Sequence, residues 1–406
     1  MKLVRFSIVA VLSIVVLVSS VGCTGAPPPQ GYSGIVTDGA SLFIGSADGK
    51  IVVLDPESRA AGAPFPASGE WQYAITTESK GTFGCGTSQL PSVLYGTPVV
   101  NDGYVCIGTY DGKVLMMQGD SRSTGLSFPQ VRAGEWEFPR TNSKIGAVVG
   151  GPAIDGNSVY ISSSVKDGTH TLGVVYALDR LYGDQLWVSE PLDGKLWVTP
   201  ALVDGVVYVS TFDGRIYSLD AATGAVLPWV FEGEFGFVAS PFAADGMLYV
   251  GSFDSRLNAV PVGATQPAWT FQADNWFWAT PVISNGVIFA PSLDGKVYAF
   301  DALTGVPAWG TPYDAGDSVA AAPVLAGDSI VVVTKKGDVH VVNAQTGMGT
   351  HVVNPSNPTA TTCNAAVIAT PCYLEGVVYV RAQNNTLYAI NPVLKTIVYT
   401  FSLKTE

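Results

Sequence analysis

The sequence predicts an all-β protein, folded as one eight-bladed β-propeller of four-stranded antiparallel blades, and three observations support this. A pattern of Pro, Asp-Gly, Thr-Gly and Trp recurs from Gly34 to near the end of the chain. The spacing between consecutive copies settles near 40 residues, the length of a four-stranded blade. Apolar residues make up 47% of the 406 residues and stand in short runs, as many short strands require.

Eight copies of this pattern can be counted from their openings. The openings are Gly34 in the first copy, then Pro98, Pro152, Pro200, Pro241, Pro281, Pro323 and Pro371. Pro is tolerated at the first residue of a strand, because that residue need not donate to the ladder. Since sheets stacked around an axis bury both faces against their neighbours, the copies predict one domain.

The copy from Pro200 to Trp229 shows the four predicted strands, which we call A to D. Turns are expected at Asp204-Gly205 between A and B, at Asp213-Gly214 between B and C, and at Thr223-Gly224 between C and D. Asp-Gly suits tight hairpins, because both residues tolerate positive φ.

Strand D of most copies contains a Trp, which we interpret as a packing residue between blades rather than as a ligand contact. These residues are Trp71, Trp136, Trp187, Trp229, Trp269 and Trp309, with His351 and Tyr399 near the same place in the last two copies.

The N-terminus is typical of an exported lipoprotein. Lys2 and Arg5 precede the apolar run 6–18, which is too short to span a membrane comfortably. Small residues then lead to Cys23, as in a lipobox. We expect a signal peptide over 1–22, a Pro-rich tether over 23–31 and the propeller over 32–406. Acylated Cys23 would hold the protein to the outer face of the cytoplasmic membrane or to the outer membrane. The alternative is ordinary cleavage that leaves Cys23 an unmodified thiol.

The charge excludes one class of partner. The net charge is −12, and loss of the segment carrying Lys2 and Arg5 would make it −14. Nucleic-acid binding requires a basic surface, so no nucleic-acid partner is expected. The only predicted membrane contact is the N-terminal lipid.

The copies share a common form, which reads Ala-x-Pro, then Asp-Gly-x-Val-Tyr-Val, then Asp-Gly-x-Val-Tyr-Ala-Leu-Asp-Ala-x-Thr-Gly, and then Trp. Over about residues 34–401, this form resembles the repeats of the pyrroloquinoline-quinone (PQQ)-like propeller superfamily. The lipobox, chain length and eight blades look most like its BamB-type outer-membrane assembly lipoproteins. This resemblance implies a non-catalytic scaffold or adaptor that binds a protein partner in the cell envelope. The fold alone does not decide function.

Two other functions stay open. The superfamily also includes PQQ-dependent dehydrogenases, but the sequence has no adjacent Cys pair and no Glu, Asn and Asp set that aligns with their calcium site. The three His residues, His170, His340 and His351, lack the spacing of metal ligands. We therefore expect no cofactor, no metal and no enzymatic activity. A propeller that binds glycan or peptidoglycan is the third hypothesis.

Four cysteines follow Cys23, and export would allow disulfides between them. Cys363 and Cys372 flank the last opening Pro, so we favour a bridge between them. A second bridge would then join Cys85 to Cys106. The alternative is four buried thiols that pack as small apolar side chains.

A group of aromatic residues lies in the predicted D-to-A connections, at the mouth of the central channel. The candidate partner-binding residues are Tyr95, Trp197, Phe235, Phe237, Trp276, Phe277 and Trp278. Clustered aromatic rings can bind a peptide, a glycan or a flat ligand. The alternative is that these rings plug the channel and pack between blades.

Overall fold

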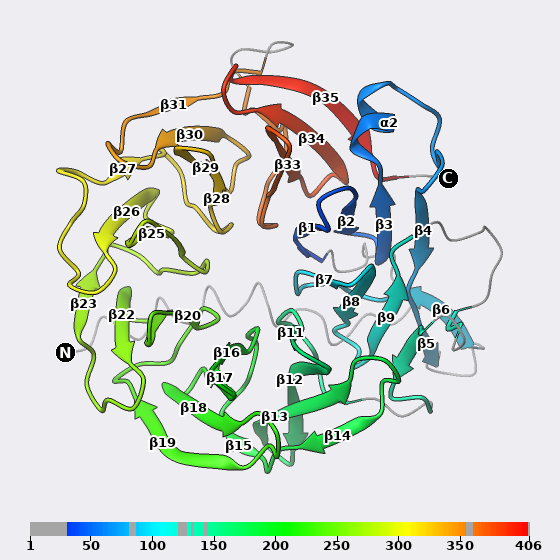
Figure 1. Cartoon of the computed structure of the whole chain (residues 1–406), viewed down its shortest axis with the longest axis vertical. Helices are drawn as coiled ribbons and strands as arrows, with labels where there is room; N and C mark the ends of the chain where they lie inside the picture. The colour runs from blue at the N-terminus through cyan, green and yellow to red at the C-terminus, as the bar shows by residue number, and fades with distance from the viewer. Residues whose placement is uncertain are drawn as a thin grey trace.

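The computed structural model describes residues 31–80, 87–120, 128–130, 134–141, 145–354 and 360–404. Eight antiparallel sheets stand around a central channel and follow one another in chain order (Figure 1). The predicted all-β fold with eight four-stranded blades is confirmed. Within these described ranges, no helix is long and apolar enough to cross a membrane.

The four strands of each blade run in sequence from the channel to the rim. Blade one contains β1 (Ile35–Thr37), β2 (Leu42–Gly45), β3 (Lys50–Leu54) and β4 (Trp71–Ala74), and blade two contains β7 (Val99–Asn101), β8 (Tyr104–Gly108), β9 (Val114–Gln118) and β10 (Trp136–Phe138). Blade three contains β11 (Ala153–Asp155), β12 (Ser158–Asp167), β13 (His170–Asp179) and β14 (Gln185–Val188), and blade four contains β16 (Ala201–Val203), β17 (Val206–Ser210), β18 (Arg215–Asp220) and β19 (Val226–Glu232).

Blade five contains β20 (Phe242–Ala244), β21 (Met247–Gly251), β22 (Arg256–Pro261) and β23 (Trp269–Gln272), and blade six contains β24 (Val282–Ser284), β25 (Val287–Pro291), β26 (Lys296–Asp301) and β27 (Tyr313–Asp314). Blade seven contains β28 (Val324–Ala326), β29 (Ser329–Val333), β30 (Val339–Asn343) and β31 (Gly349–His351), and blade eight contains β32 (Cys372–Leu374), β33 (Val377–Arg381), β34 (Thr386–Asn391) and β35 (Thr396–Ser402). Three further elements are the helix α2 (Pro56–Ala60) and the paired strands β5 (Thr76–Lys80) and β6 (Thr87–Pro91), while β15 (Leu192–Asp193) pairs with β13.

The two kinds of Asp-Gly turn differ in backbone conformation. In the A–B turn, Asp204 and Gly205 both have positive φ, 48° and 76°, as the sequence predicts. In the B–C turn, only Gly214 does, with φ of 93°. The Asp of a B–C turn acts through its side chain instead, since Asp294 Oδ1 accepts a hydrogen bond of 2.9 Å from the Lys296 N–H.

The Trp of each outer strand docks on the next blade, which confirms its interpretation as a packing residue. The indole N–H of Trp269 donates to the Ala302 carbonyl at 2.9 Å. The equivalent bonds join Trp71 to Gly119 (3.1 Å), Trp136 to Arg180 (2.8 Å), Trp187 to Ala221 (3.0 Å), Trp229 to Ala264 (2.8 Å) and Trp309 to Ala344 (2.9 Å). Trp309 makes this contact from just before β27 rather than from within it.

The ring closes between blades eight and one without a shared strand, because every blade consists of consecutive residues. Near the channel, the Ile35 N–H donates to the Thr370 carbonyl at 3.1 Å. At the rim, α2 lies beside β35 (Figure 1). There the buried Arg59 and Glu70 side chains form an ion pair of 2.7 Å, and the Arg59 guanidinium lies 4.9 Å from the ring centroid of Phe401.

Candidate functional site

The B–C turns and the D–A connections meet at one end of the channel, which we call the mouth face. Backbone N–H groups of the turns donate to carbonyls of the connections: Phe212 to Lys195 (3.2 Å), Phe253 to Gly236 (2.8 Å) and Leu293 to Trp276 (2.9 Å). These bonds place side chains from distant parts of the sequence on one rigid platform.

Side chains along the D–A connections alternate between the core and the channel. Leu196 and Phe277 are buried in clusters between blades, whereas the residues that follow them, Trp197 and Trp278, line the channel. The same alternation places Phe237 in the core and Val238, itself buried, on the channel wall.

This alternation divides the predicted binding residues. Phe237 and Phe277 are each only 1% exposed, so burial removes both from the candidate surface. Phe235 is 51% exposed. The rings of Tyr95, Trp197, Trp276 and Trp278 are partly exposed.

The channel contains a cavity of about 160 Å³, lined by residues of the D–A connections. Its wall carries four aromatic rings, those of Tyr32, Tyr95, Trp197 and Trp278. Between the rings lie the hydroxyl-bearing side chains of Thr97, Thr199, Ser240, Thr280 and Thr370. Some hydroxyls join the blades, as where the Thr199 N–H donates to Ser240 Oγ at 2.8 Å. A space of this size is smaller than most ligand pockets, so any large partner must bind at the mouth.

A continuous row of rings crosses the mouth face over blades four to six. Its members are Trp197, Phe212, Phe253 and Trp276, and we call them the aromatic row. Successive ring centroids are 5.3, 5.4 and 5.1 Å apart, with interplanar angles of 69°, 89° and 85°. All four side chains are partly exposed. Edge-to-face contacts of this kind hold each ring in place and leave apolar surface for a partner.

Two members of the aromatic row were missed by the sequence analysis. Phe212 and Phe253 stand directly before the Asp of their B–C turns, a place taken by Ala47 in blade one and Leu293 in blade six. An aromatic residue at this place in two successive copies was the available signal. In a second group of rings, Tyr95 contacts Tyr32, with centroids 4.8 Å apart in a tilted arrangement, and Tyr110, with centroids 5.4 Å apart in an edge-to-face arrangement.

One cation lies against the aromatic row. The Lys195 ammonium is 4.2 Å from the ring centroid of Trp197 and 5.7 Å from that of Phe212. Burial lowers the pKa of Lys195, and the nearby Lys166 lowers it further, while Asp213 opposes both effects. A cation over an indole face is a favourable contact that a partner could extend.

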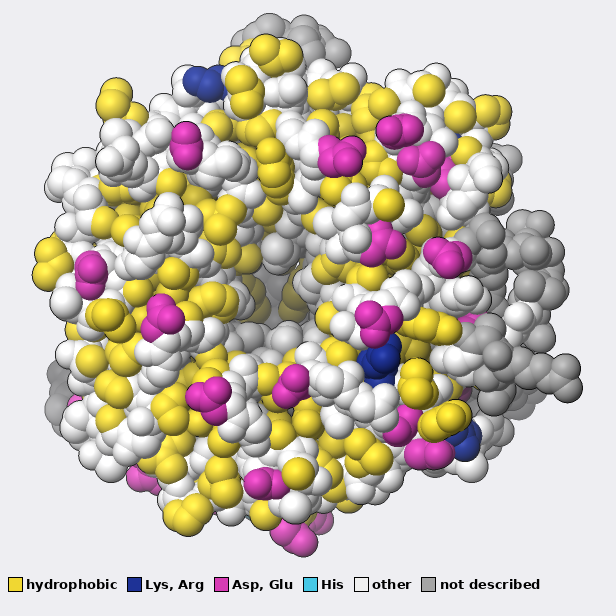
Figure 2. Space-filling view, in the orientation of Figure 1, with side chains coloured by type: hydrophobic (Ala, Val, Ile, Leu, Met, Phe, Trp, Pro, Cys, Tyr) yellow, Lys and Arg dark blue, Asp and Glu magenta, His cyan; other side chains and the backbone are white. Residues whose placement is uncertain are grey.

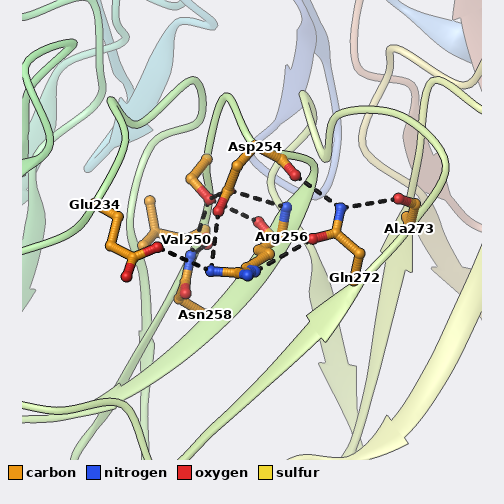
Figure 3. Close-up of polar contacts among 8 residues, drawn as sticks. Glu234, Val250, Asp254, Arg256, Asn258, Gln272 and Ala273 are labelled. Atoms are coloured by element: carbon orange, nitrogen blue, oxygen red, sulfur yellow. Dashed lines mark hydrogen bonds and ion pairs between the residues drawn. The ribbon is translucent and has the colours of Figure 1, made fainter. Parts of the chain in front are cut away.

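Ion pairs flank the aromatic row toward the rim, where the first residue of strand C meets an acid of the preceding connection. Arg215 pairs with Asp193 at 3.1 Å and Lys296 pairs with Asp274 at 3.0 Å. Figure 3 shows the third pair. There the Arg256 guanidinium lies 3.4 Å from Glu234 and 3.3 Å from Asp254, and it also donates to Gln272.

A cavity of about 250 Å³ opens beside Arg256 between blades four and five, with Phe235 on its wall. The charged groups around it, Glu232, Glu234, Asp254 and Arg256, are held in ion pairs. Among the residues that the structure describes, no three His, Cys, Asp or Glu side chains are grouped so that they could hold a metal.

The structure contradicts the predicted disulfide between Cys363 and Cys372. Cys363 and Cys372 are free and buried thiols. Cys363 packs between blades seven and eight and Cys372 between blades eight and one, so the sheet of blade eight separates them. Cys106 is also a free buried thiol, and its predicted partner Cys85 lies outside the described residues. Burial raises the pKa of Cys372 to about 11, so its thiol is neutral at physiological pH.

The opposite face consists of A–B and C–D turns and is acidic. Its A–B turns carry Asp38, Asp102, Asp155, Asp204, Asp245, Asp328 and Glu375. On the face of the molecule that Figure 2 shows, Asp and Glu side chains are numerous and Lys and Arg side chains are few. The two faces of the ring therefore present different chemistry.

An eight-bladed propeller with Asp-Gly and Thr-Gly turns and docked rim Trp residues belongs to the PQQ-like class. The chain belongs to the family whose model is described as outer membrane protein assembly factor BamB. That model matches residues 171–275 and 263–391, which together make up more than half of the chain.

Two solved structures are similar in fold. The crystal structure of BamB from Moraxella catarrhalis has a TM-score of 0.58 and 19% identity, over 82% of this chain and 90% of that one. The computationally designed Ika8 protein has a TM-score of 0.56 and 17% identity, over 76% of this chain and 87% of that one. A comparison with curated proteins gave no match.

Proposed function

We propose that the protein is a lipid-anchored, non-catalytic adaptor of the cell envelope, which binds a segment of a protein partner on its mouth face. Membership of the BamB family supports a role in the envelope. The N-terminal pattern that ends at Cys23 supports export and acylation. The observation that carries the proposal is the aromatic row, because clustered, partly exposed aromatic rings are the usual anchors of protein interfaces.

The dimensions of the aromatic row indicate the form of the partner. Three steps of just over 5 Å separate Trp197 from Trp276. An extended chain rises about 3.3 Å per residue, so the row matches a segment of about five residues. Apolar side chains of that segment would pack on the rings, and its polar groups would meet the paired charges around Arg256.

Photo-crosslinking in intact cells tests this function. A benzoylphenylalanine in place of Phe253 is expected to give one discrete protein adduct. The same group in place of Leu303, which is 60% exposed on the opposite face, is the control and should not give that adduct. The adduct should then fade when Trp197→Ala is added, while the melting temperature changes little. Identical adducts from both positions would contradict the proposal.

Two controls separate the competing functions. Loss of the Phe253 adduct on addition of soluble peptidoglycan fragments would favour the glycan-binding hypothesis instead. Dye-linked alcohol oxidation after addition of PQQ and calcium, with a thermal shift, would favour the dehydrogenase hypothesis.

A further inference from the structure

We infer that the mouth face, rather than the opposite face, is turned toward the membrane. This inference rests on the proposed acylation of Cys23. It also rests on the place where the chain enters the propeller, which the described residues fix independently.

The first described residues lie at the mouth, inside the ring of D–A connections. Ser33 donates twice to the connection of blade two, from N–H to the Leu94 carbonyl at 3.1 Å and from Oγ to the Gly96 carbonyl at 2.7 Å. Tyr32 stacks on Tyr95 at 4.8 Å and forms part of the channel wall. The chain therefore arrives beside the channel and not at the rim.

Gly31 is held in place by its surroundings. A Cβ at this position would lie 2.0 Å from the Leu94 carbonyl oxygen, so the backbone of residue 31 packs directly against the connection of blade two. Only Gly permits such a close approach.

Arg381 of β33 clamps the same segment from blade eight. Its side chain is 1% exposed, and it donates to the Ser33 carbonyl at 3.2 Å and to the Gly31 carbonyl at 3.3 Å. These two carbonyls accept from Nε and Nη2 of the buried guanidinium and offset part of the cost of its burial. Blades two and eight thus grip residues 31–33 from two sides.

The short tether then limits the orientation. Cys23 lies eight positions before Gly31, and eight residues of fully extended chain span at most about 29 Å. To bring the opposite face to the membrane, the tether would cross three strand spacings, about 14 Å, and then run down strands about 17 Å long, which is about 31 Å before the turns are added. That path is longer than the tether. A route through the channel would have to pass the rings of Tyr32, Tyr95, Trp197 and Trp278 that line it.

The charges of the two faces also favour this orientation. The A–B turns of the opposite face carry acids and no Lys or Arg, and an anionic lipid surface repels them, whereas acids of the mouth face are paired with Arg215, Arg256 and Lys296. A partner segment that reaches the aromatic row must therefore lie in the layer between the propeller and the bilayer.

Fluorescence energy transfer to labelled lipid tests the orientation. The full acylated chain, carrying Cys85→Ser, is labelled at Lys335→Cys or at Gln345→Cys and bound to phosphatidylethanolamine–phosphatidylglycerol vesicles that contain a rhodamine lipid. Both positions are exposed in blade seven, the first in its B–C turn and the second in its C–D turn. The buried thiols Cys106, Cys363 and Cys372 should not be labelled.

We expect transfer from position 335 to exceed that from position 345 at least twofold. Insertion of twenty Gly and Ser residues after Gln30 should abolish this difference, because the longer tether releases the constraint. Equal transfer with the native tether, stronger transfer from position 345, or failure of the chain to become acylated and bind the vesicles would overturn the inference. Failure of the Phe253 crosslink would instead overturn only the adaptor function.

Discussion

His340 is a titratable side chain held neutral by its position in β30. Its Nδ1 lies 2.9 Å from the Tyr313 hydroxyl, and its ring centroid is 5.3 Å from that of His351. Burial lowers the pKa of His340 to about 4, and the neighbouring His351 adds to the effect, whereas Asp338 and Asp314 oppose it. The folded protein therefore disfavours a proton that the unfolded chain accepts readily.

This site predicts a loss of stability in mild acid. Below pH 6.5 the unfolded chain gains a proton on His340 that the folded chain does not take up until about pH 4. The free energy of unfolding should fall over this range, by up to about 3 kcal/mol from this residue. Urea denaturation at pH 7 and pH 5 measures the effect. His340→Gln can keep a hydrogen bond to Tyr313 but does not titrate, so it should flatten the pH dependence; an unchanged slope would contradict the argument.

At the scale of the element, the C–D turn and the outer Trp form one docking unit. Gly305 has a φ of 71°, and a Cβ there would lie 2.6 Å from the ring of Trp269. The indole lies flat against the turn and donates to Ala302, the residue three before the Gly. The Gly of this Thr-Gly pair is thus required for two reasons: its own turn needs a positive φ, and the Trp of the neighbouring blade leaves no room for a Cβ.

A matched pair of substitutions separates these two requirements. Gly246→Ala changes a residue with φ of 73° and open space around it, so it should cost only the left-handed backbone term, about 1–2 kcal/mol. Gly305→Ala should cost a further 1–3 kcal/mol or so, since it also displaces Trp269. Chemical denaturation of the two variants measures the difference in the free energy of unfolding. Equal losses in the two variants would show that the Trp269 indole can move aside without loss of stability.

The blades could be predicted from the sequence because their turns and rim Trp residues repeat at a regular spacing. The aromatic row could not, since Phe212 and Phe253 are brought beside Trp197 and Trp276 only by hydrogen bonds between turns and connections. Nor does spacing reveal which way a side chain points in a connection, which is why buried Phe237 was counted with the surface residues.

The cysteines show the same limit of prediction from sequence spacing. Cys363 and Cys372 are nine positions apart in the sequence, yet they lie on opposite sides of the sheet of blade eight. Proximity along the chain was therefore a poor guide to pairing at a position where the chain passes from one blade interface to the next.

For the whole molecule, stability depends on closing the ring between its two ends. Glu70 accepts three hydrogen bonds, from the Arg59 side chain at 2.7 Å, the Ala67 N–H at 2.7 Å and the Asp55 N–H at 3.0 Å. Arg59 packs in turn on Phe401 of the last blade. This buried pair links the first blade to the last at the rim, while Arg381 does so at the channel.

Arg59→Met should therefore destabilise the whole ring by about 3–5 kcal/mol, because it leaves the Glu70 carboxylate buried without its cation. Adding Glu70→Gln should recover part of that loss. Arg256→Met is the control, since its pair with Glu234 is exposed and should contribute no more than about 1 kcal/mol. Thermal and urea unfolding of these three variants and of the unchanged protein provide the comparison, and equal effects at Arg59 and Arg256 would contradict a special role for closure.

The two ends of the described chain lie on the same face. The Leu403 N–H donates to the Asn385 carbonyl at 2.7 Å, and Asn385 belongs to the B–C turn of blade eight, next to the Arg381 clamp on Gly31. Since no blade borrows a strand from another, a circular permutant could join these ends and start at an A–B turn instead. A lipid attached there would turn the opposite face of the same propeller toward the membrane, and the aromatic row would then point away from the bilayer.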